Sequence, residues 1–178
     1  ALILALLYHF NFIPHRQYSN ADFGIETYIS QTDQDGDGID DQTDILQSTR
    51  EYLATKPKYK SQYYATGYPD DHYGVCTDVV AFGLKGAGYD LRELVDADRQ
   101  EHPEDYADEA PDKNIDFRRV RNLIPFFRRH TINLTTDRSN ISEWQGGDIV
   151  VFKDHIGIIS DKRNRHGVPF LIHHRSPF

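Results

Sequence analysis

The sequence predicts an α+β domain in which helices come first along the chain and a small antiparallel sheet follows. Apolar residues recur at helical spacing before Asn140, and after it they form short runs separated by Gly-rich turns. Strand and helix patterns do not alternate, as they would in a parallel sheet. With 178 residues, 38% of them apolar and 27% charged, the chain has enough material for one domain with its own core.

Two segments in the first half carry an apolar stripe at helical spacing. Residues 45–53 form one stripe, and Pro57 lies shortly beyond it. Residues 76–84 form the second stripe, which stops near Gly86. We therefore expect Cys76 at the N-terminus of a helix.

The middle of the chain is more polar. Residues 96–114 have no clear period and are expected to form a loop. Asp116 can then cap a helix that runs toward Arg129, since Asp is favoured at that position. The inward side of this helix is expected to hold Val120, Ile124 and Phe127.

Three short segments in the last third predict consecutive antiparallel strands. Residues 148–152 follow two glycines, residues 155–160 come next, and residues 168–174 follow a polar turn. The Cys76 helix is expected to pack on this sheet.

Charge and cysteine content exclude several classes of function. The chain has 20 Lys and Arg against 28 Asp and Glu, a net charge of -8, which argues against binding nucleic acid. Much of the acidity lies in residues 33–44. The single cysteine, Cys76, excludes an intrachain disulfide and any zinc site that needs two sulfurs.

The chain opens on an apolar run that fades by about Ile13, without an initiating methionine. This run is shorter than the roughly 20 residues that span a bilayer. We expect residues 1–32 to be the truncated end of a signal peptide or membrane anchor, followed by a linker. A buried helix is the alternative. The first interpretation predicts an extracytoplasmic protein with a membrane tether.

Residues 33–44 have the spacing of a calcium-binding loop of twelve residues. A Gly at position 6 permits the sharp turn, and oxygen ligands are expected at positions 1, 3, 5, 7, 9 and 12. These ligands would be Asp33, Asp35, Asp37, the Ile39 carbonyl, Asp41 and Asp44. We expect a structural Ca2+, and the alternative is a solvated acidic linker.

A cysteine at a helix N-terminus is a candidate nucleophile. The helix dipole is expected to lower the pKa of its thiol, and His155 on a later strand could accept its proton. His173 or His174 could orient that imidazole, but they point to opposite sides of their strand. The alternative is that Cys76 is a buried core residue.

The order of these motifs resembles the NlpC-type papain-like cell-wall peptidases. More closely, residues 74–80, residues 114–123 and the His155 strand resemble the family catalogued as domain of unknown function 1287. The resemblance covers about residues 45–174 and implies a papain-like core within a hydrolase domain at 45–178.

The resemblance implies a role for each site residue. Cys76 would be the nucleophile, His155 the general base and His173 the orienting third member. Tyr64 would line the site and assist the oxyanion hole. Arg118 and Arg119 would contact carboxylates of an anionic peptide, because a guanidinium matches a carboxylate with two hydrogen bonds.

We therefore expect a monomeric extracytoplasmic cysteine hydrolase, stabilised by calcium, that cleaves amide bonds in peptidoglycan stem peptides. One alternative is a non-catalytic, calcium-stabilised cell-surface binding module with a papain-like shell. Another is a metal hydrolase that uses four histidines, namely His155, His166, His173 and His174.

Overall fold

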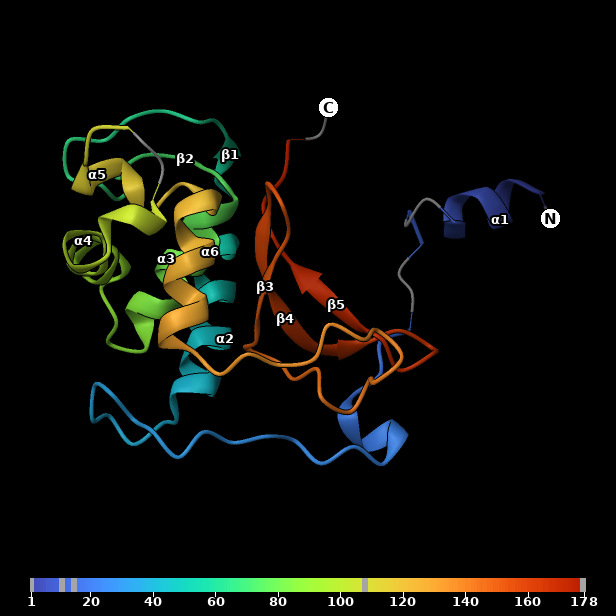
Figure 1. The fold of residues 1–178 in the computed structure, drawn as a ribbon. Coiled ribbons are helices and arrows are strands. Elements are labelled where there is room, and N and C mark those ends of the chain that lie inside the picture. Colours follow the sequence, from blue (N-terminus) through green and yellow to red (C-terminus); the bar gives the residue numbers. More distant parts are fainter. Residues whose placement is uncertain (1, 10–11, 14–15, 107–108, 177–178) are drawn as a thin grey trace.

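The computed structural model describes residues 2–9, 12–13, 16–106 and 109–176. It is a mixed α+β structure in which a group of helices lies beside a three-stranded sheet (Figure 1). The α-helices are α1 (Leu2–His9), α2 (Asp41–Ala54), α3 (Cys76–Gly86), α4 (Leu91–Glu101), α5 (Lys113–Asp116) and α6 (Val120–His130), and two short 3-10 helices span Asn20–Phe23 and Pro103–Asp105. The strands are β1 (Lys58–Tyr59), β2 (Tyr73–Gly74), β3 (Ile149–Val151), β4 (Ile156–Arg163) and β5 (Pro169–Ile172).

Helices α2 and α3 form the central pair. Helix α2 begins four residues before its apolar stripe, because the side chain of Asp40 accepts a hydrogen bond from the Thr43 N–H and caps the helix. The two backbones approach closely at Gly83, where a Cβ would collide with Thr49 of α2. Helix α3 begins at Cys76 as expected.

The sheet confirms the three predicted antiparallel strands, in the order β3-β4-β5. Ile158 of β4 lies opposite Ile149 on one side and Ile172 on the other. Ile156 and Ile158 are fully buried in the same core cluster as Val80 of α3. The helix that carries Cys76 therefore packs on the middle strand.

The expected loop at residues 96–114 is wrong for its first part, because α4 covers Leu91–Glu101. Its apolar stripe is short, with Leu91 and Val95 buried, and the next inward side chain is Asp98. Arg129 and His130 of α6 bind the Asp98 carboxylate at 2.7 and 2.6 Å. Because the third inward position, Asp98, is charged and not apolar, the sequence pattern did not identify this helix.

The expected inward side of the next helix is confirmed for Val120 and Phe127, which lie against or within the core, but not for Ile124. Asp116 ends the short helix α5 instead of capping α6, which begins at Val120 after an extended Arg119. This break rotates the buried stripe of α6 onto Asn122, Leu123, Phe126 and Phe127. Phe127 is buried at 7% exposure, and Val120 is partly buried against the core cluster.

Part of the predicted linker packs on the sheet. The Arg163 side chain is 1% exposed, and its guanidinium donates to Asn20 and to the carbonyls of Ile141, Trp144 and Gly167. Asn20 also binds Gln145. The predicted linker is therefore attached to the domain at Asn20, because the buried arginine needs these acceptors.

Helix α1 lies apart from the rest of the structure, and most of its apolar side chains are exposed (Figure 1). Among the described residues, no helix has the length and apolar character needed to cross a membrane. The predicted anchor and linker include residues 1, 10–11 and 14–15, which lie outside the described part of the chain.

Candidate active site around Cys76

Cys76 is held at the first turn of α3 with its side chain 6% exposed. Val75 is extended just before the helix, and its N–H donates to the Asp78 carboxylate at 2.7 Å. Cys76 and Ile156, the residue after His155, belong to the same core cluster, and the Ile156 N–H lies close enough to the sulfur to favour its thiolate. The fold therefore brings the cysteine beside the start of the strand that follows the predicted base.

Burial raises the pKa of the Cys76 thiol. The N–H groups of Ile156, Thr77 and Cys76 itself favour the thiolate, whereas the nearby Asp78 carboxylate disfavours it. The expectation that the helix dipole lowers this pKa is wrong, because loss of water around the sulfur outweighs the N–H groups. At neutral pH the site holds a protonated thiol.

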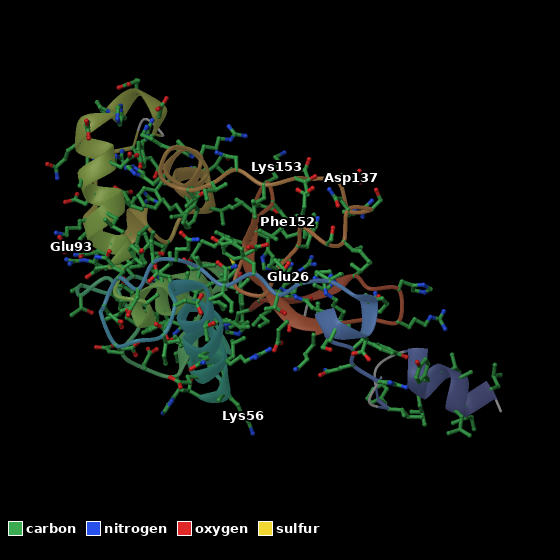
Figure 2. The ribbon with its side chains drawn as sticks, turned by 90° about the horizontal axis from the view of Figure 1, so that it is seen from below. Glu26, Lys56, Glu93, Asp137, Phe152 and Lys153 are labelled. Carbon is green, nitrogen blue, oxygen red and sulfur yellow. The ribbon has the colours of Figure 1, made fainter. Side chains whose placement is uncertain are left out.

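The β3–β4 turn, which carries Phe152 and Lys153, leads directly to His155 (Figure 2). Nε2 of His155 lies 2.9 Å from Nδ1 of His173, and the two rings are perpendicular. Partial burial, His173 and Arg175 lower the pKa of His155. His155 is therefore a neutral base near pH 7.

His173, and not His174, contacts His155. His174 leaves the strand on the other side and packs edge-on against the Tyr59 ring, with ring centroids 5.2 Å apart. Its Nδ1 is buried and has no hydrogen-bond partner among the described residues.

In the part of the chain that the structure describes, no hydrogen bond joins Cys76 to His155. Catalytic hydrogen bonds in unliganded sites are often long and tighten only when substrate binds. The arrangement places the two groups on adjoining elements, and direct proton transfer requires the imidazole to turn toward the sulfur.

A buried ion pair between Arg118 and Asp78 stabilises the first turn of α3, which carries Cys76. Arg118 donates from Nε and Nη2 to the two Asp78 oxygens at 2.7 and 2.9 Å, and from Nη1 to the Gln62 carbonyl at 2.7 Å. The two side chains are 2% and 0% exposed. Arg118 is therefore a positioning residue, and its predicted contact with substrate carboxylates is not available to it.

Arg119, the other predicted substrate arginine, is also engaged within the protein. Its Nη1 lies 2.8 Å from a Glu109 oxygen and 3.0 Å from an Asp116 oxygen. Its side chain remains 29% exposed. The structure gives Arg119 internal partners in place of the expected peptide carboxylate.

Two tyrosines surround the site, and sequence reasoning named only one. Tyr64 is 7% exposed, lies under the Arg118 guanidinium and donates its hydroxyl to Asp71 at 2.8 Å. Burial and this hydrogen bond raise the pKa of Tyr64 to about 12. Its hydroxyl is already committed to a neighbouring loop.

Tyr59 is the tyrosine that lies in electrostatic reach of the thiol. It pairs with Gly74, two residues before Cys76, in the parallel β1–β2 bridge. Partial burial and the charge of a Cys76 thiolate raise the pKa of Tyr59. Its ring is 39% exposed, so the phenol is accessible to a ligand. A parallel pair of two-residue strands has no sequence signal that would have identified it.

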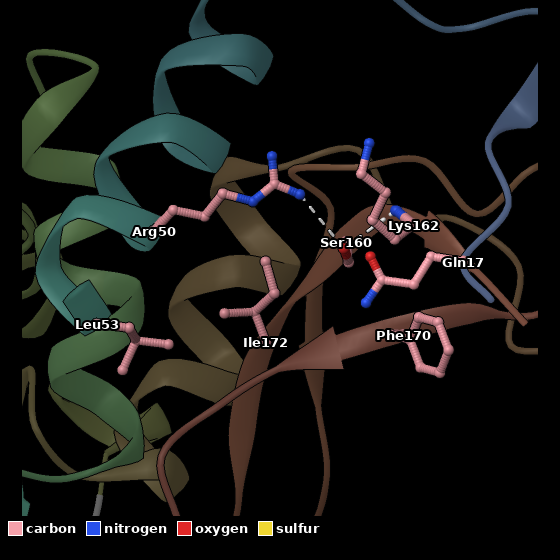
Figure 3. A pocket seen from close by; sticks show the side chains of 7 residues that line it. All are labelled: Gln17, Arg50, Leu53, Ser160, Lys162, Phe170 and Ile172. Atoms are coloured by element: carbon pink, nitrogen blue, oxygen red, sulfur yellow. Dashed lines mark hydrogen bonds between the residues drawn. The ribbon is translucent and has the colours of Figure 1, made fainter. Parts of the chain in front are cut away.

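A cleft of about 390 Å³ lies between α2 and the sheet (Figure 3). Leu53 and Ile172 line one part, and Ile172 directly precedes His173. Arg50, Lys162 and Phe170 line the part farther along the strands. The cleft extends away from the histidine pair along the same sheet.

The acidic loop brings together the side chains of Asp33, Asp35 and Asp37, whose ligand atoms lie within 4.8 Å of one another. Ile39 continues the loop, and Asp44 is buried in the first turn of α2. The four histidines of the metal-hydrolase alternative do not converge, since His166 binds Arg165 in the β4–β5 turn. Among the described residues, only the aspartate group is compact enough to hold a metal ion.

Comparisons with known proteins identify a family. A family model described as "Domain of unknown function (DUF1287)" matches residues 46–178. The "Uncharacterized protein YijF" of Escherichia coli (strain K12) is 39% identical over 126 residues, which cover 66% of this chain and 61% of that protein. No solved structure matches. The chain therefore belongs to the DUF1287 family.

Proposed function

We propose that the protein is a cysteine hydrolase of amide bonds with an NlpC-type, papain-like core. The observation that carries the proposal is the position of the Cys76 sulfur at the start of α3, against the N–H that follows His155, with His155 bound to His173 at 2.9 Å. A nucleophile, a neutral base and a group that orients the base are the three parts that such chemistry needs.

The states of the two groups favour general-base attack over a preformed thiolate. The thiol pKa is raised and the imidazole pKa is lowered, so both groups are neutral at pH 7. As the sulfur attacks the carbonyl carbon, His155 accepts the thiol proton. The proton then passes to the leaving amine, and a thioester remains on Cys76. Water hydrolyses the thioester, releases the acid and restores the thiol.

The tetrahedral oxyanion needs hydrogen-bond donors. The backbone N–H of Cys76 at the start of α3 is one donor, because the first N–H groups of a helix have no partner within it. The Tyr59 hydroxyl is the second donor. It replaces the Tyr64 hydroxyl, which already donates its hydrogen bond to Asp71.

The substrate class that we propose is the stem peptide of peptidoglycan, on the basis of the resemblance to NlpC-type peptidases. A protein that acts there works outside the cytoplasm, and we propose a monomer held near the membrane by its N-terminal apolar segment. The exposed apolar side chains of α1, such as Leu2 and Ile3, support this tether.

The proposal is tested by incubating the protein with purified muropeptides and identifying products by mass spectrometry. We expect new amine and carboxylate ends with wild type and none with Cys76→Ala or His155→Ala. His166→Ala is the matched control, since His166 lies in the distant β4–β5 turn. Cleavage that persists in Cys76→Ala would refute the nucleophile.

The burial and raised pKa of Cys76 also favour a second candidate, the non-catalytic binding module. Thiol alkylation by iodoacetamide separates the two. A catalytic pair predicts that His155→Ala changes the pH dependence of labelling. Labelling that is indifferent to His155, together with intact muropeptides, would support the binding module.

A further inference from the structure

We propose that residues 33–44 bind a calcium ion and that the buried carboxylate of Asp44 completes the site. This inference is independent of the proposed hydrolase activity. The bound ion joins the start of α2 to the end of α3.

The exposed part of the site is the group of Asp33, Asp35 and Asp37. Their ligand atoms already lie within 4.8 Å of one another. The N–H groups of Gly36 and Gly38 donate to Asp33 and shape the loop around it. Exposed acidic groups are common without an ion, so this group alone does not define a site.

Asp44 supplies the second, independent observation. Its side chain is 7% exposed, and Oδ2 has no hydrogen-bond partner among the described residues. A buried carboxylate without a partner is strongly unfavourable. Asp44 also lies close enough to Asp37, Asp35 and Asp33 for their charges to act on its carboxylate. A cation bound to the three loop carboxylates gives the Asp44 carboxylate a partner.

Asp41 is not a direct ligand, contrary to the expectation from spacing. Its oxygens accept hydrogen bonds from the Thr32 hydroxyl at 2.6 Å, the Gln34 N–H at 2.8 Å and the Tyr89 hydroxyl at 2.6 Å. Position 9 of such loops often reaches the ion through water. Asp41 therefore braces the loop against Tyr89.

The donor set selects calcium. All candidate ligands are oxygens, including the Ile39 carbonyl at position 7, which excludes zinc as the preferred metal. Magnesium requires near-ideal octahedral geometry and retains its water. A loop whose oxygen ligands close around the ion to about 2.3–2.6 Å suits Ca2+.

The bound ion connects the two central helices. Asp35 packs on the turn after α3, where a Cβ on Gly88 would lie 3.0 Å from the Asp35 Cβ. Asp41 holds the neighbouring Tyr89. Cys76 lies at the opposite end of α3, about 16 Å away at 1.5 Å per residue over its 11 residues. The ion stabilises the helix pair and does not take part in the reaction.

The test measures ion binding and stability on the full chain. Terbium binds calcium sites, and Tyr89 is placed to sensitise its luminescence. We expect saturable terbium luminescence that calcium chloride displaces and magnesium chloride does not. We also expect calcium to raise Tm and excess EGTA to remove the increase.

The variant Asp44→Asn distinguishes a calcium ligand from an aspartate that has only a structural role. The neutral amide relieves the repulsion from the three loop carboxylates, so Tm in EGTA is expected to rise. Calcium affinity is expected to fall at least tenfold, and the calcium-dependent increase in Tm is expected to disappear. Asp137→Asn, in another exposed loop, is the control and should bind as wild type does.

Two further variants keep the test decisive. Asp37→Asn changes an exposed side chain and should weaken calcium binding without unfolding the protein. Tyr89→Phe should remove terbium luminescence while the calcium-dependent Tm increase persists. The proposal is overturned if calcium leaves Tm unchanged in wild type, or if Asp44→Asn binds calcium with wild-type affinity.

Discussion

Arg118→Met tests the buried ion pair beneath Cys76. Methionine fills the volume of the arginine stem but removes the guanidinium. Asp78, which is 0% exposed, would then keep one donor, the Val75 N–H at 2.7 Å. Removing one partner of such a pair leaves an uncompensated charge in the interior.

The expected loss of stability is about 3–5 kcal/mol, the usual range for breaking a buried pair. No discount for solvent applies, since both side chains are at most 2% exposed. Domains of this kind have a total stability of roughly 5–15 kcal/mol, so the variant folds but unfolds at a much lower urea concentration.

The assay is urea unfolding followed by circular dichroism. Arg50→Met is the matched control, because Arg50 and Asp161 form an ion pair that is 41% and 38% exposed, which predicts a loss of at most about 1 kcal/mol. The double variant Asp78→Asn/Arg118→Met should be more stable than Arg118→Met alone, since it removes the stranded charge. A loss below about 1 kcal/mol for Arg118→Met would refute the burial argument.

The remaining predictions concern activity and packing. The acid limb of kcat/KM should lie below pH 6.5, because the active base is neutral His155 and its pKa is lowered from 6.5; a limb above pH 7 in a pH–rate profile would contradict this. Tyr59→Phe should lower kcat by about 10²-fold as an oxyanion donor is lost, and an unchanged kcat in the muropeptide assay would exclude that role. Tyr64→Phe should instead act mainly on stability, by about 1 kcal/mol in urea unfolding, since it removes the hydrogen bond to Asp71; a larger effect on kcat than that of Tyr59→Phe would reverse the assignment. Leu123→Ala should cost about 2–5 kcal/mol in the same assay, because Leu123 is fully buried, and a smaller loss would indicate that the core collapses around the cavity.

Local patterns in the sequence were enough to predict several helices and strands. The apolar stripe from Cys76 and the alternation after Asn140 predicted α3 and the three strands, because a helix and a strand each impose a short period on the residues that they bury. The spacing of the aspartates likewise indicated one compact acidic loop. These features depend on neighbours within a few residues along the chain.

Contacts between distant residues decided the remainder. Leu91 and Val95 of α4 have helical spacing, but the next buried position, Asp98, is charged and is satisfied by Arg129 and His130 of the distant α6. The alternation of side chains along a strand could not decide whether His173 or His174 meets His155. The contact across the sheet shows that it is His173.

The arginine and tyrosine assignments changed for the same reason. Arg118 was expected to contact substrate carboxylates, but its guanidinium instead binds the carboxylate of Asp78, 40 positions earlier. Tyr59 approaches the thiol through a parallel bridge to Gly74 that has no sequence pattern. The sequence by itself determined the central helix that carries Cys76, the three-stranded sheet and the chemical groups that these elements carry. Only the tertiary structure decided which groups meet, because burial and pairing depend on residues that the chain brings together from far apart.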